Sequence, residues 1–315
     1  MLFTALLWLV GLWLLSVLGL FLFNLLLIRI VERLVPPIGR FIHVAGLRLH
    51  VWDSGEKPGQ SGPPLLFIHG WLGQMNHFAY GLAQKFPERR VVLIDRPGSG
   101  YSQAADAMDM AAQADVIAKA AAALNLEKPL LVGHSLGGSV ALALGLAHAQ
   151  DLAGLALIAP LTLYQPLPPH FRFLAKQGAA ARKFGSWTLA PLMTLLSFGA
   201  ARRISFGPDP MPGDFAKRAG GALALRPRAL EAAAREVPTQ QDELNAMAPR
   251  YASMGLPVEL LFGASDRTLD PKVQGEGFRA RAPGALLTVI PGGHMLPITQ
   301  ADGCEKFLRD MIARL

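Results

Sequence analysis

The stretch "LLVGHSLGGSV", Leu130 to Val140, changes from an apolar run to a serine enclosed by glycines. The run "LLV" predicts a short buried strand, and the residues from Leu136 onward predict a helix. Gly133 and Gly137 flank Ser135 with the G-x-S-x-G spacing of a nucleophile elbow. The alternative is an ordinary turn residue or helix cap. The position between a strand and a helix favours a nucleophile, because a strained turn there exposes the hydroxyl.

Segments with strand and helix patterns alternate on both sides of this turn. The first, "FIHVAGLRLHVWD", predicts a hairpin with Gly46 near its turn. Later apolar runs alternate with helical patterns, which is typical of a mostly parallel sheet covered by helices on both faces. We expect further strands in "PLLFIHG", "RVVLIDRPGSG", "LAGLALIAP", "PVELLFGASDR" and "ALLTVI", and helices over 108–126, over 136–149, from Asp270-Pro271 with Asp270 as N-cap, and from about 298 to the end.

A serine nucleophile needs a base, and in an open parallel sheet the reacting groups lie beyond the carboxyl ends of the strands. His294 follows the last expected strand in "VIPGGHMLP", whereas the other histidines occupy the hairpin, a helix, the insertion, a loop or the position before Ser135. Asp266 follows the penultimate strand in "LLFGASDRTLD" and is the expected orienting carboxylate. Its rival Asp270 is explained as a helix cap, and Asp95 is expected to be structural in the turn "DRPGSG".

Acyl transfer also requires N–H donors for the oxyanion, and the backbone usually supplies them. Leu136, the residue after the nucleophile, is one expected donor. Trp71, in the loop "HGWLG" after the third strand, is the other, and its side chain is also a candidate wall of the pocket. Because this chemistry uses neither a metal ion nor a cofactor, we predict none.

Residues 161–249 interrupt the alternation and predict a helical insertion, or lid, at one end of the sheet. Between Leu161 and Gln240, 11 basic residues face 4 acidic ones, a difference of 7 that equals the net charge of the whole chain. The interleaved residues are mostly small or aliphatic, so we expect an anionic membrane surface or an amphiphilic substrate and no nucleic acid. The apolar run "WTLAPLMTLLSFGA", Trp187 to Ala200, either lines an acyl pocket, touches lipid or packs on the sheet.

The N-terminal segment, Leu2 to Ile28, contains no charged side chain. As a helix its 27 residues span about 40 Å, more than the ~30 Å hydrocarbon core of a bilayer. We therefore predict a retained single-pass anchor. A removable signal peptide is the alternative, but a basic n-region and a small-x-small cleavage site are missing. Arg29, Arg33 and Arg40 follow the span and predict that the catalytic domain is cytoplasmic.

Five motifs, in the order "FIHGWLG", "DRPGSGYS", "GHSLGG", "GASDR" and "GGHMLP", make residues 40–315 resemble the α/β-hydrolase superfamily. The resemblance implies an α/β-hydrolase fold with an eight-stranded, mostly parallel sheet, a triad of Ser135, Asp266 and His294, and the oxyanion donors named above. Serine at the elbow argues against haloalkane dehalogenases and epoxide hydrolases, which carry aspartate there. With its anchor, the chain is similar to membrane-anchored monoacylglycerol-lipase-like members. The expected divisions are an anchor over 1–35, core over 36–160, lid over 161–249 and core over 250–315.

The leading functional hypothesis is a membrane-anchored serine hydrolase that cleaves carboxylic esters of hydrophobic acyl groups through an acyl-enzyme. The first alternative is a hydrolase of carbon–carbon bonds in ring-fission products, whose carboxylates would also suit a basic lid, or another non-lipid hydrolase of this fold. An alternative of a different class is a non-catalytic binding scaffold, which the ordered Ser, Asp and His motifs disfavour.

Overall fold

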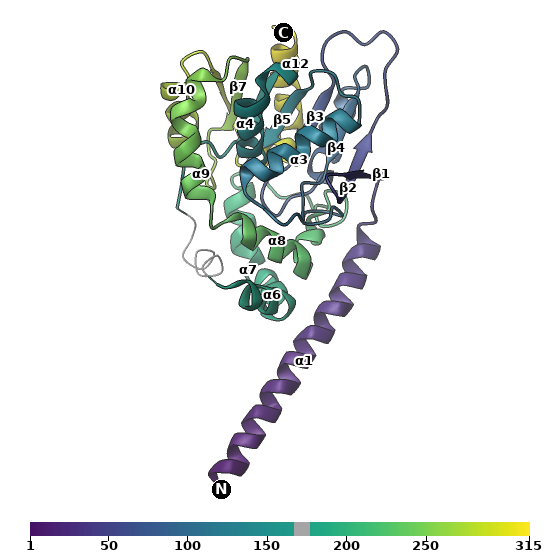
Figure 1. Cartoon of the computed structure of the whole chain (residues 1–315), viewed down its shortest axis with the longest axis vertical. Helices are drawn as coiled ribbons and strands as arrows, with labels where there is room; N and C mark the ends of the chain where they lie inside the picture. Colours follow the sequence, from purple (N-terminus) through teal and green to yellow (C-terminus); the bar gives the residue numbers. More distant parts are fainter. Residues whose placement is uncertain (167–176) are drawn as a thin grey trace.

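An eight-stranded sheet forms the centre of the computed structural model, which describes residues 1–166 and 177–315 (Figure 1). His170, Arg172 and Lys176 of the predicted lid lie outside the described residues. The strand order is β1-β2-β4-β3-β5-β6-β7-β8, with β2 antiparallel to both neighbours and all other pairs parallel. The predicted eight-stranded, mostly parallel sheet is confirmed. The strands are β1 (Arg40–Val44), β2 (Leu47–Asp53), β3 (Leu65–Ile68), β4 (Val91–Ile94), β5 (Leu130–His134), β6 (Gly154–Ile158), β7 (Val258–Gly263) and β8 (Leu286–Ile290).

The burial of each strand follows its place in the sheet. Every residue of β3, β4, β5, β6 and β7 is buried, because helices cover both faces of the inner strands. The edge strand β8 exposes Leu286 and Val289. The β1–β2 hairpin turns at Ala45 and Gly46, which both have positive φ, the backbone that a two-residue hairpin turn requires.

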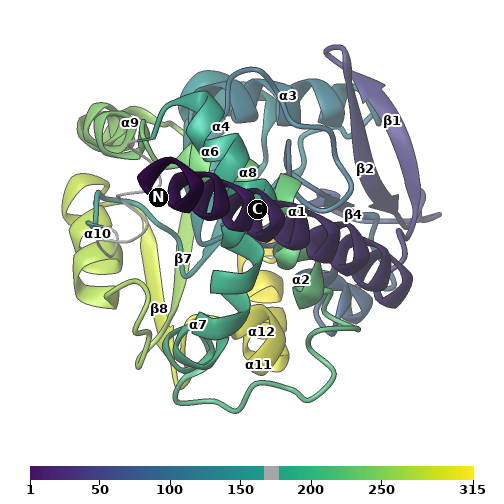
Figure 2. The same ribbon diagram turned by 90° about the horizontal axis from the view of Figure 1, so that it is seen from below.

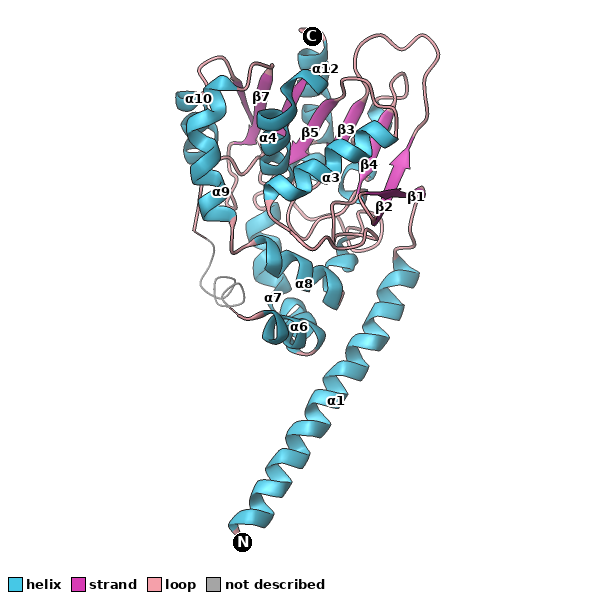
Figure 3. Ribbon diagram, in the orientation of Figure 1, coloured by secondary structure: helices cyan, strands magenta, loops and turns pink. Residues whose placement is uncertain are grey.

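Helices form a layer on each face of the sheet (Figure 3). On one face α3, α4 and α10 enclose the larger core; on the other, α2, α11 and α12 enclose a second core that includes Phe78 and Phe307. The helices outside the lid are α1 (Leu2–Leu34), α2 (Asn76–Ala79), α3 (Met110–Ala123), α4 (Leu136–His148), α10 (Gly277–Arg281), α11 (Leu296–Thr299) and α12 (Ala301–Ile312).

Three helix boundaries differ from those predicted. The helix expected over 108–126 is shorter, because Asp109 accepts a hydrogen bond from the Ala112 N–H and caps α3. Asp270 does cap the Lys272 N–H at 2.9 Å, but the first turn is a π-helix (Lys272–Glu276) before α10. The final helix begins earlier than residue 298 and is divided at Gln300 into α11 and α12.

The described part of the lid is mainly helical, with a non-helical connection over 207–220, and it lies beyond the carboxyl ends of the strands. It contains α6 (Ala179–Trp187), α7 (Leu189–Phe206), α8 (Pro227–Glu236) and α9 (Gln240–Met247), with α6 and α7 bent by 64° at their junction. Helix α7 packs mainly on α6 and α8 and buries only Pro191 and Phe206. Of the alternatives for the apolar run at 187–200, packing on the sheet is therefore wrong, because the run contacts other lid helices instead.

Helix α1 extends away from the domain that contains the sheet as a single rod (Figure 1). Among the described residues it is the one unbroken helix long and apolar enough to cross a membrane, and its apolar window is unburied. Its C-terminal part docks on the lid: Val31 and Val35 pack against Ala222 and Leu223, and Asn24 contacts the junction of α6 and α7. Seen from below, α1 crosses the underside of the domain over the lid helices (Figure 2).

Candidate active site

Ser135 occupies a strained turn between β5 and α4. Its backbone has φ +54° and ψ −124°, a combination that an L-residue adopts only where the surroundings enforce it. The flanking glycines allow this, because a Cβ on Gly133 would lie 2.8 Å from the carbonyl oxygen of Gly137, and one on Gly137 would lie 2.2 Å from that of Ile68. A Cβ on Gly138 would lie 2.6 Å from Pro160. The strand–turn–helix geometry predicted for "GHSLGG" is therefore present.

The structure brings Ser135, His294 and Asp266 together from three strand ends. The Ser135 Oγ lies 3.0 Å from His294 Nε2, and His294 Nδ1 lies 2.8 Å from Asp266 Oδ2. Asp266 Oδ1 accepts hydrogen bonds from the Thr268 and Leu269 N–H groups at 2.8 and 2.9 Å, which leaves Oδ2 for the imidazole. With Nδ1–H donating to Asp266, Nε2 is the acceptor that faces the serine hydroxyl.

The loop that carries His294 crosses the end of β7 with very little clearance. A Cβ on Gly263 would lie 2.3 Å from the Gly293 carbonyl oxygen and 2.5 Å from that of Gly292. Gly292 has φ +136°, so the two glycines of "PGGH" let the chain turn where a side chain would not fit. Asp270, the rival carboxylate, is exposed and caps the turn at 272–276, so it plays no part in this arrangement.

Each expected oxyanion donor belongs to a peptide group whose carbonyl is held in place. The Gly70 carbonyl, on the same peptide as the Trp71 N–H, accepts from Arg96 Nη2 and the Gly73 N–H, both at 3.1 Å. The Ser135 carbonyl, on the same peptide as the Leu136 N–H, accepts from the Gly138 and Leu161 N–H groups at 2.9 and 3.1 Å. In a planar trans peptide the C=O and the N–H point in opposite directions, so the hydrogen bonds that hold the carbonyl also fix the direction of the N–H.

The loop with Trp71 also lies close enough to serve the nucleophile. A Cβ on Gly70 would be 2.8 Å from the Cβ of Ser135, so only glycine permits this approach. The indole Nε1 of Trp71 donates to the Ala233 carbonyl on α8 at 3.0 Å, which joins this loop to the lid. The side chain of Trp71 packs against the larger core, so its alternative role as a wall is compatible with the backbone role.

Arg96 and Glu236 form a buried ion pair that sequence reasoning missed. Their side chains are 0% and 3% exposed, and Arg96 Nη1 donates to Glu236 Oε1. Arg96 Nε donates to the His69 carbonyl at 2.8 Å, and Nη1 donates to Gln113 Oε1 at 2.5 Å. The guanidinium therefore joins the end of α8 to the loop of the expected oxyanion donor. The sequence indicates that Arg96, in "DRPG", follows a strand, but no sequence pattern indicates that Glu236 in the lid is its partner.

His134 is a second residue that sequence reasoning set aside. Its Nε2 lies 3.0 Å from the His294 carbonyl oxygen and donates to it, and the two rings are 5.0 Å apart. Burial, followed by the charge of His294, holds the pKa of His134 well below its ordinary value. His69 is likewise kept neutral, because burial and then the charge of Arg96 lower its pKa. Neutral neighbours avoid repelling a positive charge that develops on His294.

Asp95 has the structural role predicted for it. Its carboxylate accepts from the Met75 N–H at 2.8 Å and the Tyr101 N–H at 2.9 Å, and it lies 2.7 Å from His50 Nδ1. These contacts fix the turn after β4 against neighbouring loops. Among residues 1–166 and 177–315, no group of three or more His, Cys, Asp or Glu side chains is placed to hold a metal ion.

A family model for the alpha/beta hydrolase fold matches residues 63–301, and the chain belongs to this family. The similarity also extends to solved structures. A structure described as a membrane phospholipase A superposes with a TM-score of 0.67 at 24% identity, covering 98% of this chain and 99% of the other. This likeness independently supports the fold.

Sequence relatives within the family differ in their described activities. The chain is 27% identical over 281 residues to the acetyltransferase component of an acetoin cleaving system from Pseudomonas putida, covering 89% of this chain and 70% of the relative. It is 35% identical over 128 residues to a 2-hydroxymuconate semialdehyde hydrolase from a Pseudomonas species, covering 39% and 44%. It is 37% identical over 107 residues to a pimeloyl-[acyl-carrier protein] methyl ester esterase from Aeromonas hydrophila, covering 34% and 41%.

Proposed function

We propose that this protein is a membrane-anchored serine hydrolase that cleaves carboxylic esters of hydrophobic acyl groups, such as monoacylglycerols. The observation that carries the proposal is the hydrogen-bonded series from the strained Ser135 through His294 to Asp266, with contacts of 3.0 and 2.8 Å. Such a series supplies a nucleophile, its general base and a group that orients the base.

The residues divide the reaction into two proton-balanced steps. Ser135 Oγ attacks the ester carbonyl while His294 Nε2 takes the hydroxyl proton, and the Trp71 and Leu136 N–H groups bind the oxyanion. His294 returns that proton to the departing alcohol and leaves an acyl-serine. A water molecule then gives its proton to His294 and attacks the acyl carbon, which releases the acid and regenerates the serine hydroxyl. Asp266 stabilises the imidazolium in both steps.

Two arguments favour an uncharged ester over a carboxylate-bearing substrate. The arginines that the described structure buries, Arg96 and Arg226, each face a carboxylate, Glu236 and Glu32, and so are already neutralised. A substrate carboxylate would need a cation of its own in a desolvated site. The esterase relative cleaves a methyl ester by its description, which supports the same bond type here.

The second candidate function is hydrolysis of a carbon–carbon bond in a ring-fission product. The 2-hydroxymuconate semialdehyde hydrolase relative favours it, and the same serine, histidine and aspartate geometry serves both reactions. A panel of p-nitrophenyl and glycerol esters with graded acyl length, assayed beside 2-hydroxymuconate semialdehyde, separates the two. We expect turnover of medium or long esters; faster turnover of the ring-fission product would select the alternative.

A fluorophosphonate probe tests the nucleophile directly. We expect wild-type protein to be labelled and Ser135→Ala to be unlabelled, with Ser139→Ala as a matched control because that buried hydroxyl bonds the Leu161 carbonyl. Equal labelling of wild type and Ser135→Ala would refute the assignment. Absence of labelling and turnover in folded wild-type protein would support the binding-scaffold alternative.

We further propose that α1 spans the membrane with the catalytic domain in the cytoplasm. The support is the uncharged apolar stretch of α1 from Leu2 to Ile28, which is followed by Arg29 and Arg33 at the C-terminal end of the same helix. Protease accessibility of the domain in right-side-out and inverted vesicles tests the orientation. Digestion only in inverted vesicles is expected; digestion only in right-side-out vesicles would reverse it, and release of the domain without α1 would indicate a cleaved signal.

A further inference from the structure

The anchor contacts the lid through two polar side chains: Glu32 pairs with Arg226 near the end of α1, and Asn24 lies further along the span. Its Nδ2 donates to the carbonyl oxygens of Trp187 and Thr188 at 2.9 and 2.8 Å, and the residue is fully buried. These carbonyls lie at the bend between α6 and α7, where helical hydrogen bonding is interrupted. An amide within an apolar span thus fixes the bend of the lid beside the anchor.

The position of this contact along α1 sets its depth in a bilayer. The ring of Phe21, three residues before Asn24, lies 6.1 Å from that of Trp187, so two side chains of the anchor meet the same end of α6. A count back from Arg29, the first charged side chain after the span, places Asn24 five residues inside, or about 7 Å along the helix axis. This count places the bend of the lid inside the hydrocarbon near its boundary.

Helix α7 has the surface that this depth requires. Leu189, Met193, Leu196 and Ile204 recur at helical spacing and are 52%, 56%, 72% and 48% exposed; we call them the α7 face. Leu195 and Phe198 are also exposed on other sides of the same helix, so much of its surface away from α6 and α8 is apolar and not covered by protein. An apolar helix surface normally packs against protein or lipid, and no protein in the described structure covers this one.

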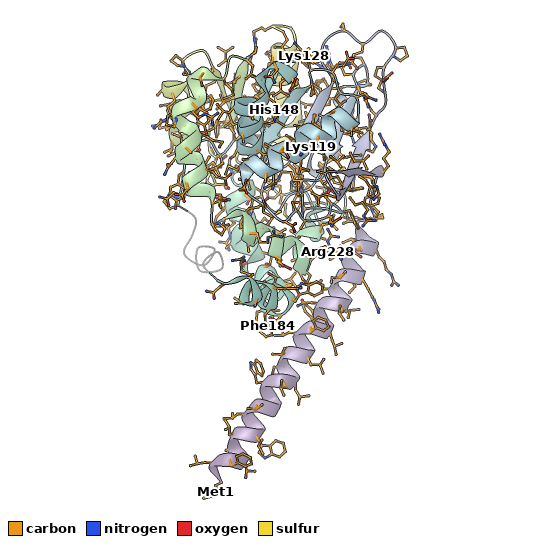
Figure 4. The ribbon with its side chains drawn as sticks, viewed as in Figure 1. Met1, Lys119, Lys128, His148, Phe184 and Arg228 are labelled. Atoms are coloured by element: carbon orange, nitrogen blue, oxygen red, sulfur yellow. The ribbon has the colours of Figure 1, made fainter. Side chains whose placement is uncertain are left out.

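Charge and continuity identify a bilayer as the occupant of the α7 face. Exposed Arg202 and Arg203 follow the apolar section of α7, and exposed Lys183 precedes it on α6, which is the distribution of an interfacial helix on anionic lipid. Phe184, also exposed, points to the same side of the molecule as the anchor, whereas Lys128 lies at the opposite end (Figure 4). The apolar surface is therefore an extension of the anchor.

The other end of α7 reaches the active site. A Cβ on Gly293, next to His294, would lie 2.3 Å from the Gly207 carbonyl at the end of α7. Asp209 Oδ2 accepts from the Gly293 N–H at 3.2 Å and from Thr299 Oγ1 at 2.9 Å. One helix therefore connects the anchor contact at Thr188 with the loop that carries the base.

We propose that α7 is a second membrane-contact element: with Asn24 holding its start against the anchor, it lies in the bilayer interface and presents the active-site end of the sheet to lipid-embedded substrate. This inference rests on the proposed function for its substrate, and on α1 as a membrane span for its geometry. The contact itself does not depend on which ester is cleaved.

Site-specific labelling of the full chain in nanodiscs containing anionic lipid, at one copy per disc, tests the contact. A single cysteine at Leu196, Phe184 or Lys128 carries a fluorophore, while native Cys304 remains because it is buried and burial raises its thiol pKa. Nitroxide lipids are expected to quench the label at Leu196 and Phe184 several-fold more than the label at Lys128. Equal quenching at all three sites would overturn the proposal. If the label at Leu196 is protected from the nitroxide lipids only when each disc holds two copies of the chain, the α7 face would instead be assigned to contact with a second copy.

Activity with two kinds of substrate tests the functional consequence. Leu196→Asp changes an exposed side chain, so folding is preserved; it should lower hydrolysis of vesicle-embedded ester at least tenfold and leave a soluble short-chain ester unaffected. Leu315→Asp, an exposed leucine at the C-terminus, is the matched control. Asn24→Leu removes two hydrogen bonds, which corresponds to roughly a thirtyfold shift toward an undocked lid, and should reduce quenching at Leu196.

The two proposals fail separately. If wild type hydrolyses neither ester, the proposed function fails, and the quenching pattern still decides the membrane contact. If Leu196→Asp retains full activity on vesicle-embedded ester while wild type hydrolyses both substrates, the role of α7 in substrate access is refuted and the esterase assignment stands.

Discussion

Removal of the Arg96 guanidinium is expected to damage stability and catalysis through different contacts. Arg96→Met leaves the Glu236 carboxylate, 3% exposed, without its partner, and such a loss in a buried ion pair costs about 3–5 kcal/mol. It also removes the Arg96 hydrogen bond to the Gly70 carbonyl, which then keeps only contacts within its own loop, from the Gly73 N–H and His69 Nδ1, so the orientation of the Trp71 N–H loosens. Loss of one oxyanion donor typically lowers kcat by about 10²–10³, so kcat should fall toward that range with little change in KM.

A double variant separates the two effects. Arg96→Met combined with Glu236→Leu removes the unpaired charge, so it should regain a large part of the stability lost in the single variant. It cannot restore the hydrogen bond to Gly70, so kcat should remain low. Urea unfolding followed by tryptophan fluorescence and turnover of a soluble ester, both on the full chain in detergent, measure the two quantities. Recovery of kcat together with stability would refute the argument that Arg96 orients the oxyanion loop.

Three further predictions concern the triad, the elbow and buried histidine. Asp266→Asn should lower kcat by about 10⁴ while the fold is retained, since the imidazole loses its orienting charge; a drop under tenfold on the soluble ester would contradict this. Gly137→Ala places a Cβ 2.2 Å from a backbone oxygen and should abolish turnover, whereas Gly199→Ala, with nothing within 4 Å, should be active. Burial lowers the pKa of His77 from 6.5 to about 4. As the pH falls from 6.5 to 4, His77 is therefore protonated in the unfolded chain but stays neutral in the folded protein. Its contribution to stability, present above pH 6.5, should decline by about 3 kcal/mol by pH 4, and His77→Gln should flatten the decline in urea midpoint.

The predictable parts of the structure are those with local signals. Ser135, Asp266 and His294 were identifiable because each follows an apolar strand, and parallel strands bring their carboxyl ends to one edge. The glycines around Ser135 also signalled the elbow, since a tight strand-to-helix turn leaves no room for side chains. The sheet followed from the same alternation of short apolar runs with helical segments.

The parts that escaped prediction depend on contacts between distant residues. Glu236 lies 140 residues from Arg96, and Asn24 lies 163 residues from Trp187, so no short pattern relates either pair. The bend between α6 and α7 also depends on a distant contact, because the Thr188 carbonyl at the bend accepts a hydrogen bond from Asn24 of the anchor. The π-turn at 272–276 was also unforeseen, since an Asp-Pro start predicts only that a helix begins.

The short connection between α1 and β1 has a kinetic consequence. Only residues 35–39 separate the two elements, and a connection of this length reaches at most about 17 Å. In addition, the Tyr101 hydroxyl donates a hydrogen bond to the Val35 carbonyl at 2.5 Å. For a chain held in a bilayer by α1, the catalytic domain stays at a fixed height and encounters substrate by lateral diffusion. Its rate then depends on the mole fraction of substrate in the membrane, so dilution with inert lipid slows it at constant bulk concentration.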